Sequence, residues 1–193
     1  FGAGCLVGNG VMAGNRMVLS AKSPVTDMFG DTNVGGNFPV LMRKAGIDNL
    51  VFQGKAKEPV YVLLKGNGDI EIHSAKDIWG KYTDETTDIL TQRHGEKSEV
   101  ACIGTAGENL IRFANVMMSK NHAAGRMGLG CVMGSKNLKA VVIEFSVRKM
   151  LPGDQELFDE IRFKWLKNCM KSMSTALGKV YGTLFLLEIN MKG

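Results

Sequence analysis

Cysteine and histidine are scarce in this sequence, and neither forms a recognisable metal-binding pattern. No two cysteines have the spacing of a CxxC motif, and the histidines are equally dispersed. A metal site held wholly by side chains of this chain is therefore not predicted. A disulfide framework, which small secreted domains use in place of a large core, is not expected either. The residues concerned are Cys5, Cys102, Cys131, Cys169, His73, His94 and His122.

Long hydrophobic runs are also missing. No stretch approaches the roughly 18 apolar residues that a membrane span requires, and the first residues lack a basic segment followed by an apolar one. We therefore expect no membrane span, a cytoplasmic location, and free, mostly buried thiols.

Aromatic residues make up only 7% of the chain, and its basic residues are scattered. The formal net charge of +5 permits an anionic partner. However, we find no helix-turn-helix, RNP-like or zinc-finger pattern that would organise contacts to bases. A solvated surface with a modest excess of positive charge is favoured over nucleic-acid binding.

Glycine, by contrast, is abundant, with 24 residues among 193, where about 7% is usual. The apolar fraction of 45% and the charged fraction of 22% are typical of a globular protein. The glycines gather in four clusters: residues 4–16 (GCLVGNGVMAGNR), 31–36 (DTNVGG), 104–109 (GTAGEN) and 121–140 (NHAAGRMGLGCVMGSKNLKA).

Hydrophobic patterning predicts a sheet-rich first part with few helices. Helices are expected at residues 38–45, where Gly46 ends the helix, and at 83–94, with Thr83 as its cap. Residues 59–75 predict a β-hairpin that turns at Gly66–Gly68. Further strands are expected at 17–23, 49–56, 99–104, 109–118 and 138–147.

The pattern changes to a helical period after residue 151. Leu157, Ile161, Trp165 and Leu166 fall on one helical face, and Asp154 stands where the helix would begin. The predicted fold class is α+β, with mixed or antiparallel sheets and few helices, followed by the start of an all-α domain. The predicted domains are residues 1–150 and 151–193.

Each glycine cluster lies at the end of a predicted strand and has Arg, Asn or Lys nearby. Glycine leaves backbone N–H groups free to converge on an anion, and an adjacent cation adds fixed charge. A phosphate-bearing ligand and ordinary tight turns are about equally favoured by this pattern. A Rossmann unit is poorly supported, and GxxxxGK[ST] is absent.

Six segments, in order and with matching gaps, resemble the N-terminal domain of the tungsten-containing aldehyde:ferredoxin oxidoreductases. The resemblance covers roughly residues 4–145. The segments read GNRMVLSAKSPVT, DTNVGGNF, RKAGIDNLVFQGKAKEPVYVLL, IEIHSAKDIWGK, IGTAGENLIRFANVM and AAGRMGLGCVMGSKNLKAVV. The resemblance begins partway into the N-terminal domain of this family.

This resemblance implies a cofactor of two pterin-dithiolene groups, which hold one tungsten or molybdenum through four sulfurs and whose phosphates are bridged by magnesium. Arg16 would pair with a pterin phosphate. Backbone carbonyls of Asn33 and Ala123 would help to position the magnesium. The cofactor-binding residues implied are Arg16, Asn33, Val34, Gly35, Gly36, His122, Ala123, Ala124, Gly125 and Arg126. No catalytic residue is assigned.

One position departs from the family, because well-known hyperthermophile members have arginine where this chain has His122. A histidine offers at most one charge and no bidentate fork. A phosphate contact and an ordinary loop histidine are equally open for His122, and Arg126 is the stronger candidate.

Several other polar residues are assigned structural roles. Lys136 and Lys139 are expected on a solvated face, Glu108 at a backbone N–H cap, and Cys131 as a small buried residue.

For the complete protein, the resemblance implies oxidation of an aldehyde to a carboxylic acid. Electrons would pass through a 4Fe-4S cluster, with ligands outside this chain, to ferredoxin or another electron carrier. The remaining domains of the enzyme are expected partners, and the complete protein is expected to form a homo-oligomer. The chain alone is expected to be inactive, and either poorly soluble or dependent on a partner. Alternatives are an aromatic thioester reductase of the benzoyl-CoA type in the same family, and a non-catalytic phosphate- or nucleotide-binding module.

Overall fold

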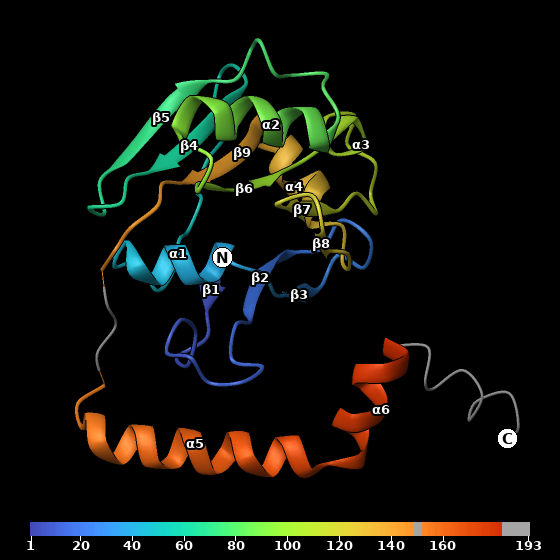
Figure 1. Cartoon of the computed structure of the whole chain (residues 1–193). Helices are drawn as coiled ribbons and strands as arrows, with labels where there is room; N and C mark the ends of the chain where they lie inside the picture. The colour runs from blue at the N-terminus through green and yellow to red at the C-terminus, as the bar shows by residue number, and fades with distance from the viewer. Residues whose placement is uncertain (149–151, 183–193) are drawn as a thin grey trace, which may run out of the picture.

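The structure is a computed structural model that describes residues 1–148 and 152–182. Two sheets and two layers of helices make up its main body (Figure 1). The strands are β1 (Gly2–Ala3), β2 (Met17–Lys22), β3 (Phe29–Val34), β4 (Val60–Leu64), β5 (Ile70–Ser74), β6 (Glu99–Cys102), β7 (Val116–Met118), β8 (His122–Ala124) and β9 (Leu138–Ile143). The helices are α1 (Phe38–Lys44), α2 (Thr83–His94), α3 (Thr105–Glu108), α4 (Leu129–Ser135), α5 (Gln155–Lys171) and α6 (Met173–Tyr181).

The smaller sheet is antiparallel, in the order β1-β2-β3. The larger sheet has the order β5-β4-β9-β6-β7-β8. Its β4–β9 pair is parallel and its other pairs are antiparallel. The α+β class with mixed and antiparallel sheets is therefore confirmed.

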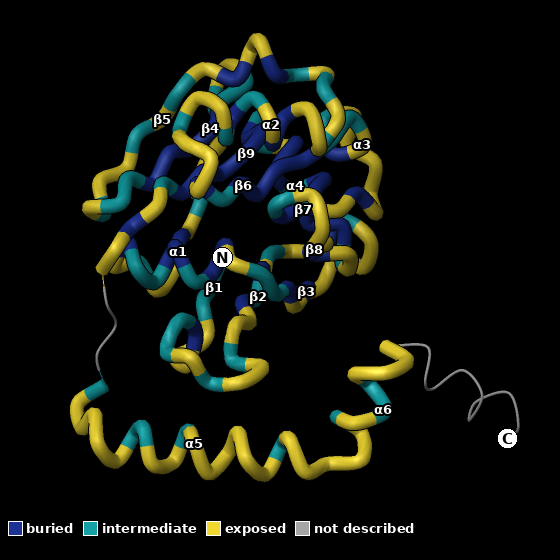
Figure 2. Tube along the Cα trace, viewed as in Figure 1, coloured by how far each residue is buried: buried dark blue, intermediate teal, exposed yellow. Residues whose placement is uncertain are grey.

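Strand β9 lies in the middle of the molecule, and all six of its residues are buried (Figure 2). Helix α2 covers one face of the larger sheet, while α1 and the smaller sheet lie on the other (Figure 1). A core cluster fills each side. The cluster between the larger sheet and α2 includes Leu90 of α2, and the cluster on the other side of this sheet includes Phe38 of α1. Apart from Lys139, the residues of β9 are apolar, because both faces of the strand are covered.

The elements with local signals form as predicted. Residues 59–75 make the hairpin of β4 and β5, and Gly68 takes the positive φ of +96° that its turn requires. Helix α1 ends before Gly46, whose φ is +87°. Helix α2 begins at Thr83, one residue earlier than a Thr83 cap would place it, because Tyr82 is the cap residue, and the Tyr82 N–H donates to the Glu85 carboxylate at 3.2 Å.

Two predicted strands are wrong. Residues 49–56 form an extended loop, because the position beside β9 is taken by β4, and the Ala56 N–H donates instead to the Lys136 carbonyl at 3.1 Å. Residues 109–118 contribute only the short strand β7, because the chain turns at Leu110 with a φ of +58°. Just before this turn, Thr105–Glu108 form the short helix α3, with Gly104 at its N-cap.

The prediction of a solvated Lys139 is also wrong. Its side chain is fully buried and forms an ion pair with Glu108, whose side chain is 4% exposed. Lys139 Nζ also donates to the Lys81 carbonyl at 2.8 Å. Glu108 does cap a backbone group, since the Gly80 N–H donates to its Oε2 at 2.9 Å. Lys136 lies nearer the surface and donates to the Gly54 carbonyl at 2.9 Å.

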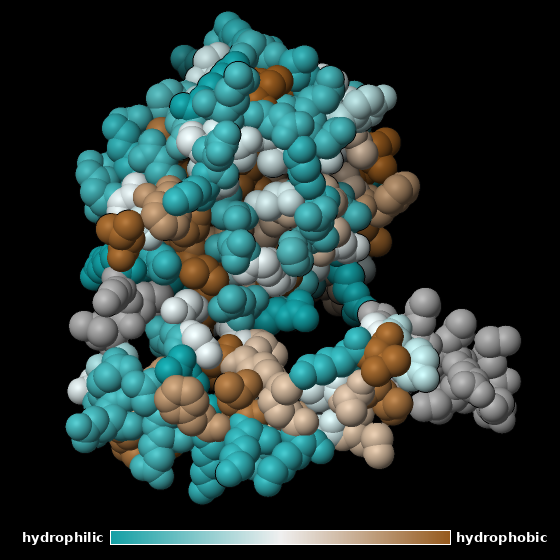
Figure 3. Space-filling view, in the orientation of Figure 1, coloured by the Kyte–Doolittle hydropathy of each residue, from teal (hydrophilic) through white to brown (hydrophobic). Residues whose placement is uncertain are grey.

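Helix α5 begins as predicted at Asp154, whose carboxylate accepts the Leu157 N–H at 2.9 Å. No residue of α5 or α6 is buried, and apolar side chains gather on these helices in the lower part of Figure 3. None of the described helices is both long and apolar enough to cross a membrane. The predicted domain boundary at residue 150 lies outside the described residues.

The cysteines are free thiols, as expected. Cys102 and Cys131 are buried, whereas Cys5 is exposed. Burial raises the pKa of the Cys102 thiol to about 11, so this group stays protonated at neutral pH.

A cluster of rings joins the β4–β5 hairpin to the end of α2. Tyr61 stacks on His73 with ring centroids 5.1 Å apart, and its hydroxyl lies 3.1 Å from His94 Nε2. Burial lowers the pKa of His94 from its usual value.

We expect this cluster to make stability pH-dependent. A histidine whose pKa is lower in the folded chain binds fewer protons there than in the unfolded chain. The free energy of unfolding should therefore fall as the pH drops through about 6.5 and on to the lower pKa of the folded state. Urea titrations at pH 7.5 and 5.5 should show a smaller decrease for His94→Gln. An equal decrease in that variant would assign the effect to other groups.

Candidate functional site

Strand β3 forms the first wall of a polar cavity. Its residues alternate, so Asp31 and Asn33 are exposed while Thr32 and Val34 are buried. The Val34 side chain, 2% exposed, belongs to the core. Only the backbone of Val34 can therefore face a ligand, whereas Asn33 offers both its amide side chain and its backbone.

The second wall is β8 and the turn that follows it. Ala123, Gly125 and Arg126 are exposed, while Ala124 is fully buried in the core. The backbone then bends sharply, because Met127 and Gly128 both have left-handed conformations with φ of +63° and +69°. This bend keeps Arg126 outside the core and lets α4 enter it.

Close contacts hold the two walls together. The Ser23 hydroxyl, just after β2, donates to the Met127 carbonyl at 2.9 Å. A Cβ on Gly30 of β3 would lie 2.8 Å from the Met127 Cβ, so the Met127 side chain packs directly on a bare stretch of strand. Glycine at position 30 is required for this approach.

The cavity between the walls has a volume of about 520 Å³. It combines exposed backbone with one guanidinium and one carboxylate, which suits a large polar ligand that carries anionic groups. Its lining residues are Asp31, Thr32, Asn33, Ala123, Gly125, Arg126 and Met127.

The remaining predicted residues meet beside this cavity. The Arg16 guanidinium lies 3.8 Å from the position that a Cβ on Gly35 would occupy. His122 Nδ1 lies 3.1 Å from the corresponding position on Gly36. A Cβ on Gly36 would crowd the His122 ring, whereas a Cβ on Gly35 would touch the Arg16 side chain at an ordinary van der Waals distance. Two basic side chains thus lie against this pair of glycines.

Three residues that line the cavity were not predicted from the sequence: Asp31, Thr32 and Met127. The signal for Asp31 was available, because it stands two residues before Asn33 and a strand places such residues on the same face. Met127 carried no signal, since its place depends on the contact with Gly30.

The described part of the chain brings no three His, Cys, Asp or Glu residues together as a metal site. A metal here would therefore need ligands from a bound cofactor or from backbone oxygens.

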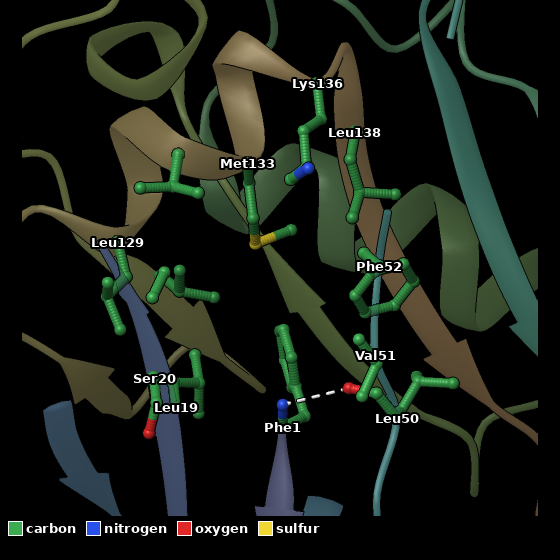
Figure 4. Close-up of a pocket in the computed structure, with 13 residues that line it drawn as sticks. Phe1, Leu19, Ser20, Leu50, Val51, Phe52, Leu129, Met133, Lys136 and Leu138 are labelled. Carbon is green, nitrogen blue, oxygen red and sulfur yellow. Dashed lines mark hydrogen bonds between the residues drawn. The ribbon is translucent and has the colours of Figure 1, made fainter. Parts of the chain in front are cut away.

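A second cavity, of about 150 Å³, lies between the two sheets (Figure 4). Phe1, Leu19, Met133 and Leu138 point into it, and it is mostly apolar. This lining does not suit an anionic ligand.

Both a family model and individual relatives match this chain over most of its length. The family described as aldehyde ferredoxin oxidoreductase, N-terminal domain, matches residues 1–145. The tungsten-containing aldehyde ferredoxin oxidoreductase of Pyrococcus furiosus is 40% identical over 190 residues, covering 97% of this chain and 31% of the relative. The aliphatic sulfonate oxidoreductase WOR-like subunit of the same organism is 35% identical over 170 residues, which cover 81% of this chain and 26% of the relative.

Among solved structures, the active site complex BamBC of benzoyl coenzyme A reductase, in complex with 1,5-dienoyl-CoA, superimposes with a TM-score of 0.84. It is 32% identical, and the match covers 88% of this chain and 26% of that one. The chain thus spans about a third of the length of the curated relatives it matches most fully.

Proposed function

The chain belongs to the aldehyde ferredoxin oxidoreductase family, and from this premise we propose that it provides the base on which a tungsten or molybdenum bispterin cofactor lies. The observation that carries the proposal is the cavity of about 520 Å³ between β3 and residues 123–127. Most of its lining residues are polar, and one arginine lies in it and another beside it.

The residues present fit such a group. A Cβ added to Gly125 would find only the Asn115 side chain and the Ala123 Cβ within 4 Å, so it would project into space that a ligand can use. A flat, polar pterin with a phosphate tail needs this combination of open backbone and fixed cations.

Each of the predicted residues has a role in this proposal. Arg126 and Arg16 would hold phosphate oxygens, and His122 would add a further donor beside Gly36. The backbone carbonyls of Asn33 and Ala123 would help to hold a magnesium ion, either directly or through its water shell. The backbone of Val34–Gly36 and Ala123–Gly125 would contact the pterins.

In the complete protein, the bound cofactor supplies two-electron chemistry at the metal, oxidising an aldehyde with water to a carboxylic acid. The two electrons would pass to a 4Fe-4S cluster held outside this chain, which would supply them to ferredoxin or a similar carrier in the cytoplasm, and the two protons would be released to water. This chain's own part is to bind and orient the cofactor. Homo-oligomerisation of the complete protein belongs to the same proposal.

A second candidate is a reductase of aromatic thioesters. The observation that favours it is the structural match to the benzoyl coenzyme A reductase complex, at 32% identity. Both candidates use the same base for the cofactor, so they differ in residues beyond this chain. A phosphate- or nucleotide-binding module without metal is the remaining alternative.

Replacing Arg126 with alanine is expected to weaken cofactor retention by about tenfold or more, since a charge-assisted hydrogen bond contributes roughly 1.5–3 kcal/mol. The protein would be purified and its tungsten and molybdenum measured by mass spectrometry. Pterin would be measured by fluorescence after oxidative release. Arg126→Lys should retain part of the binding, because one charge remains without the planar fork.

Lys120→Ala provides the matched control, because Lys120 is an exposed cation paired with Asp88 rather than a residue of the cavity. It should keep wild-type metal and pterin content. Equal content in Arg126→Ala and the wild type would contradict the assigned role. Bound nucleotide without either metal would instead support the non-catalytic alternative.

A further inference from the structure

Strand β5 is the last strand on one side of the larger sheet. It pairs with β4 alone, in an unbroken antiparallel register from Val60–Ser74 to Leu64–Ile70. No described segment runs along its outer side in Figure 1. It contains neither proline nor lysine, residues that often protect such an edge from pairing with other strands.

The hydrogen bonds of the hairpin show which backbone groups face outward. At its two ends, the Lys65 N–H donates to Asp69 and the Ala75 N–H donates to Pro59, both at 2.8 Å. Hydrogen-bonded pairs alternate with non-bonded pairs along an antiparallel ladder. The N–H and C=O groups of Ile70, Ile72 and Ser74 therefore point away from β4, toward the free edge.

The opposite strand agrees with this assignment. The Val60 N–H donates to the Asn137 carbonyl, and the Leu64 carbonyl accepts the Glu144 N–H, each at 2.9 Å. The backbone groups of Val60 and Leu64 thus face β9, and by the same alternation those of Tyr61 and Leu63 face β5.

Apolar side chains accompany the free backbone groups. Ile70 and Ile72 are 53% and 70% exposed. They lie directly opposite Leu64 and Val62, which are buried in the core. The apolar face of the sheet therefore extends past its covered part to the outermost strand.

The other face of β5 carries a complementary pair of ionisable groups. Glu71 and His73 lie on the α2 side, with His73 Nε2 3.0 Å from a Glu71 oxygen. These two residues are placed symmetrically about Ile72.

We propose that β5 pairs with β5 of a second copy of this chain, antiparallel and centred on Ile72. In this register each outward-facing residue meets another: Ile72 faces Ile72, and Ile70 faces Ser74. Glu71 of each copy faces His73 of the other in a closely spaced non-bonded pair. The contact is isologous, so the two sheets join into one around a two-fold axis.

The charge pattern favours a second copy as the occupant. With Ile72 at the centre, the sequence Ile-Glu-Ile-His-Ser sets each acid opposite a histidine and brings no like charges together. Shifting the register by one residue would lose this match and would place backbone donors out of alignment.

Cysteine cross-linking tests the register. In a Cys5→Ser, Cys169→Ser background, Ile72→Cys places the two new cysteines in facing positions with Cα atoms about 5.5 Å apart, within the range for a disulfide. Mild oxidation should give a covalent dimer on a non-reducing gel. Ile70→Cys is the matched control, since its two copies lie four residues out of register, about 14 Å apart, and should stay monomeric.

Sedimentation velocity of the purified chain gives the second measurement. The wild type should form a dimer at tens of micromolar, and Ile72→Lys should sediment as a monomer because two ammonium groups would face each other. Val51→Lys, at an apolar residue 77% exposed outside β5, should keep the dimer. A monomeric wild type, or equal cross-linking of Ile72→Cys and Ile70→Cys, would overturn the proposal.

Discussion

Replacing Lys139 with alanine is expected to lower the free energy of unfolding by about 3–5 kcal/mol, because it leaves the Glu108 carboxylate buried without its partner charge. Lys139 has no solvent exposure, and it joins β9 to α3 and to the Lys81 carbonyl. The change should appear as a lower midpoint in a urea titration followed by circular dichroism.

An exposed ion pair serves as the comparison. The side chains of Lys76 and Glu58 are 60% and 63% exposed, and pairs of this kind contribute about 0–1 kcal/mol. Lys76→Ala should therefore leave the midpoint nearly unchanged. The double variant Lys139→Met, Glu108→Gln should recover part of the loss, because the amide can still accept the Gly80 N–H. A double variant less stable than Lys139→Ala alone would contradict the uncompensated charge as the cause.

Replacing Gly134 with alanine is expected to destabilise the protein by about 3 kcal/mol, at the upper end of what overpacking usually costs. An added Cβ would lie 1.9 Å from the Gly107 carbonyl oxygen. Helices α3 and α4 would have to separate, and the buried Glu108 sits at the end of α3. Thermal or urea unfolding would measure the change.

Gly178 is the matched control, because it too lies inside a helix, α6, but no atom of the described residues lies within 4 Å of an added Cβ. Gly178→Ala should not destabilise the protein and should favour α6 by up to about 1 kcal/mol. If both glycine variants changed stability in the same direction, the close approach at Gly134 would not be the determinant.

Features with a local cause could be predicted from the sequence. The β4–β5 hairpin follows from a glycine turn between two apolar runs, and α2 follows from its length, its acidic first turn and Gly95 after it. The glycine loops were identified as candidate ligand sites for the same reason, since small residues next to cations are visible without knowing the fold.

Features that depend on contacts with residues far away in the sequence could not be predicted. Residues 49–56 have the composition of a strand, yet their position against α4 and β9 is decided by Lys136 and Asn137, some eighty residues later. Lys139 stands in an apolar run, but its acceptors come from Lys81 and Glu108, and no sequence pattern connects them. The alternation of exposed and buried residues along β3, which places Asp31 on the same face as Asn33, is visible in the sequence but was not used to predict Asp31 as a site residue.

The contact between Ser23 and Met127 joins residues 104 positions apart. Because the cavity needs both, it cannot exist on a ribosome-bound chain until residues near 128 have emerged. Local helices and hairpins form earlier, while contacts of such long sequence separation form late. A ligand that binds this cavity can therefore bind only after synthesis has passed this region. A bound ligand indicates that the segments around Ser23 and Met127 have packed together.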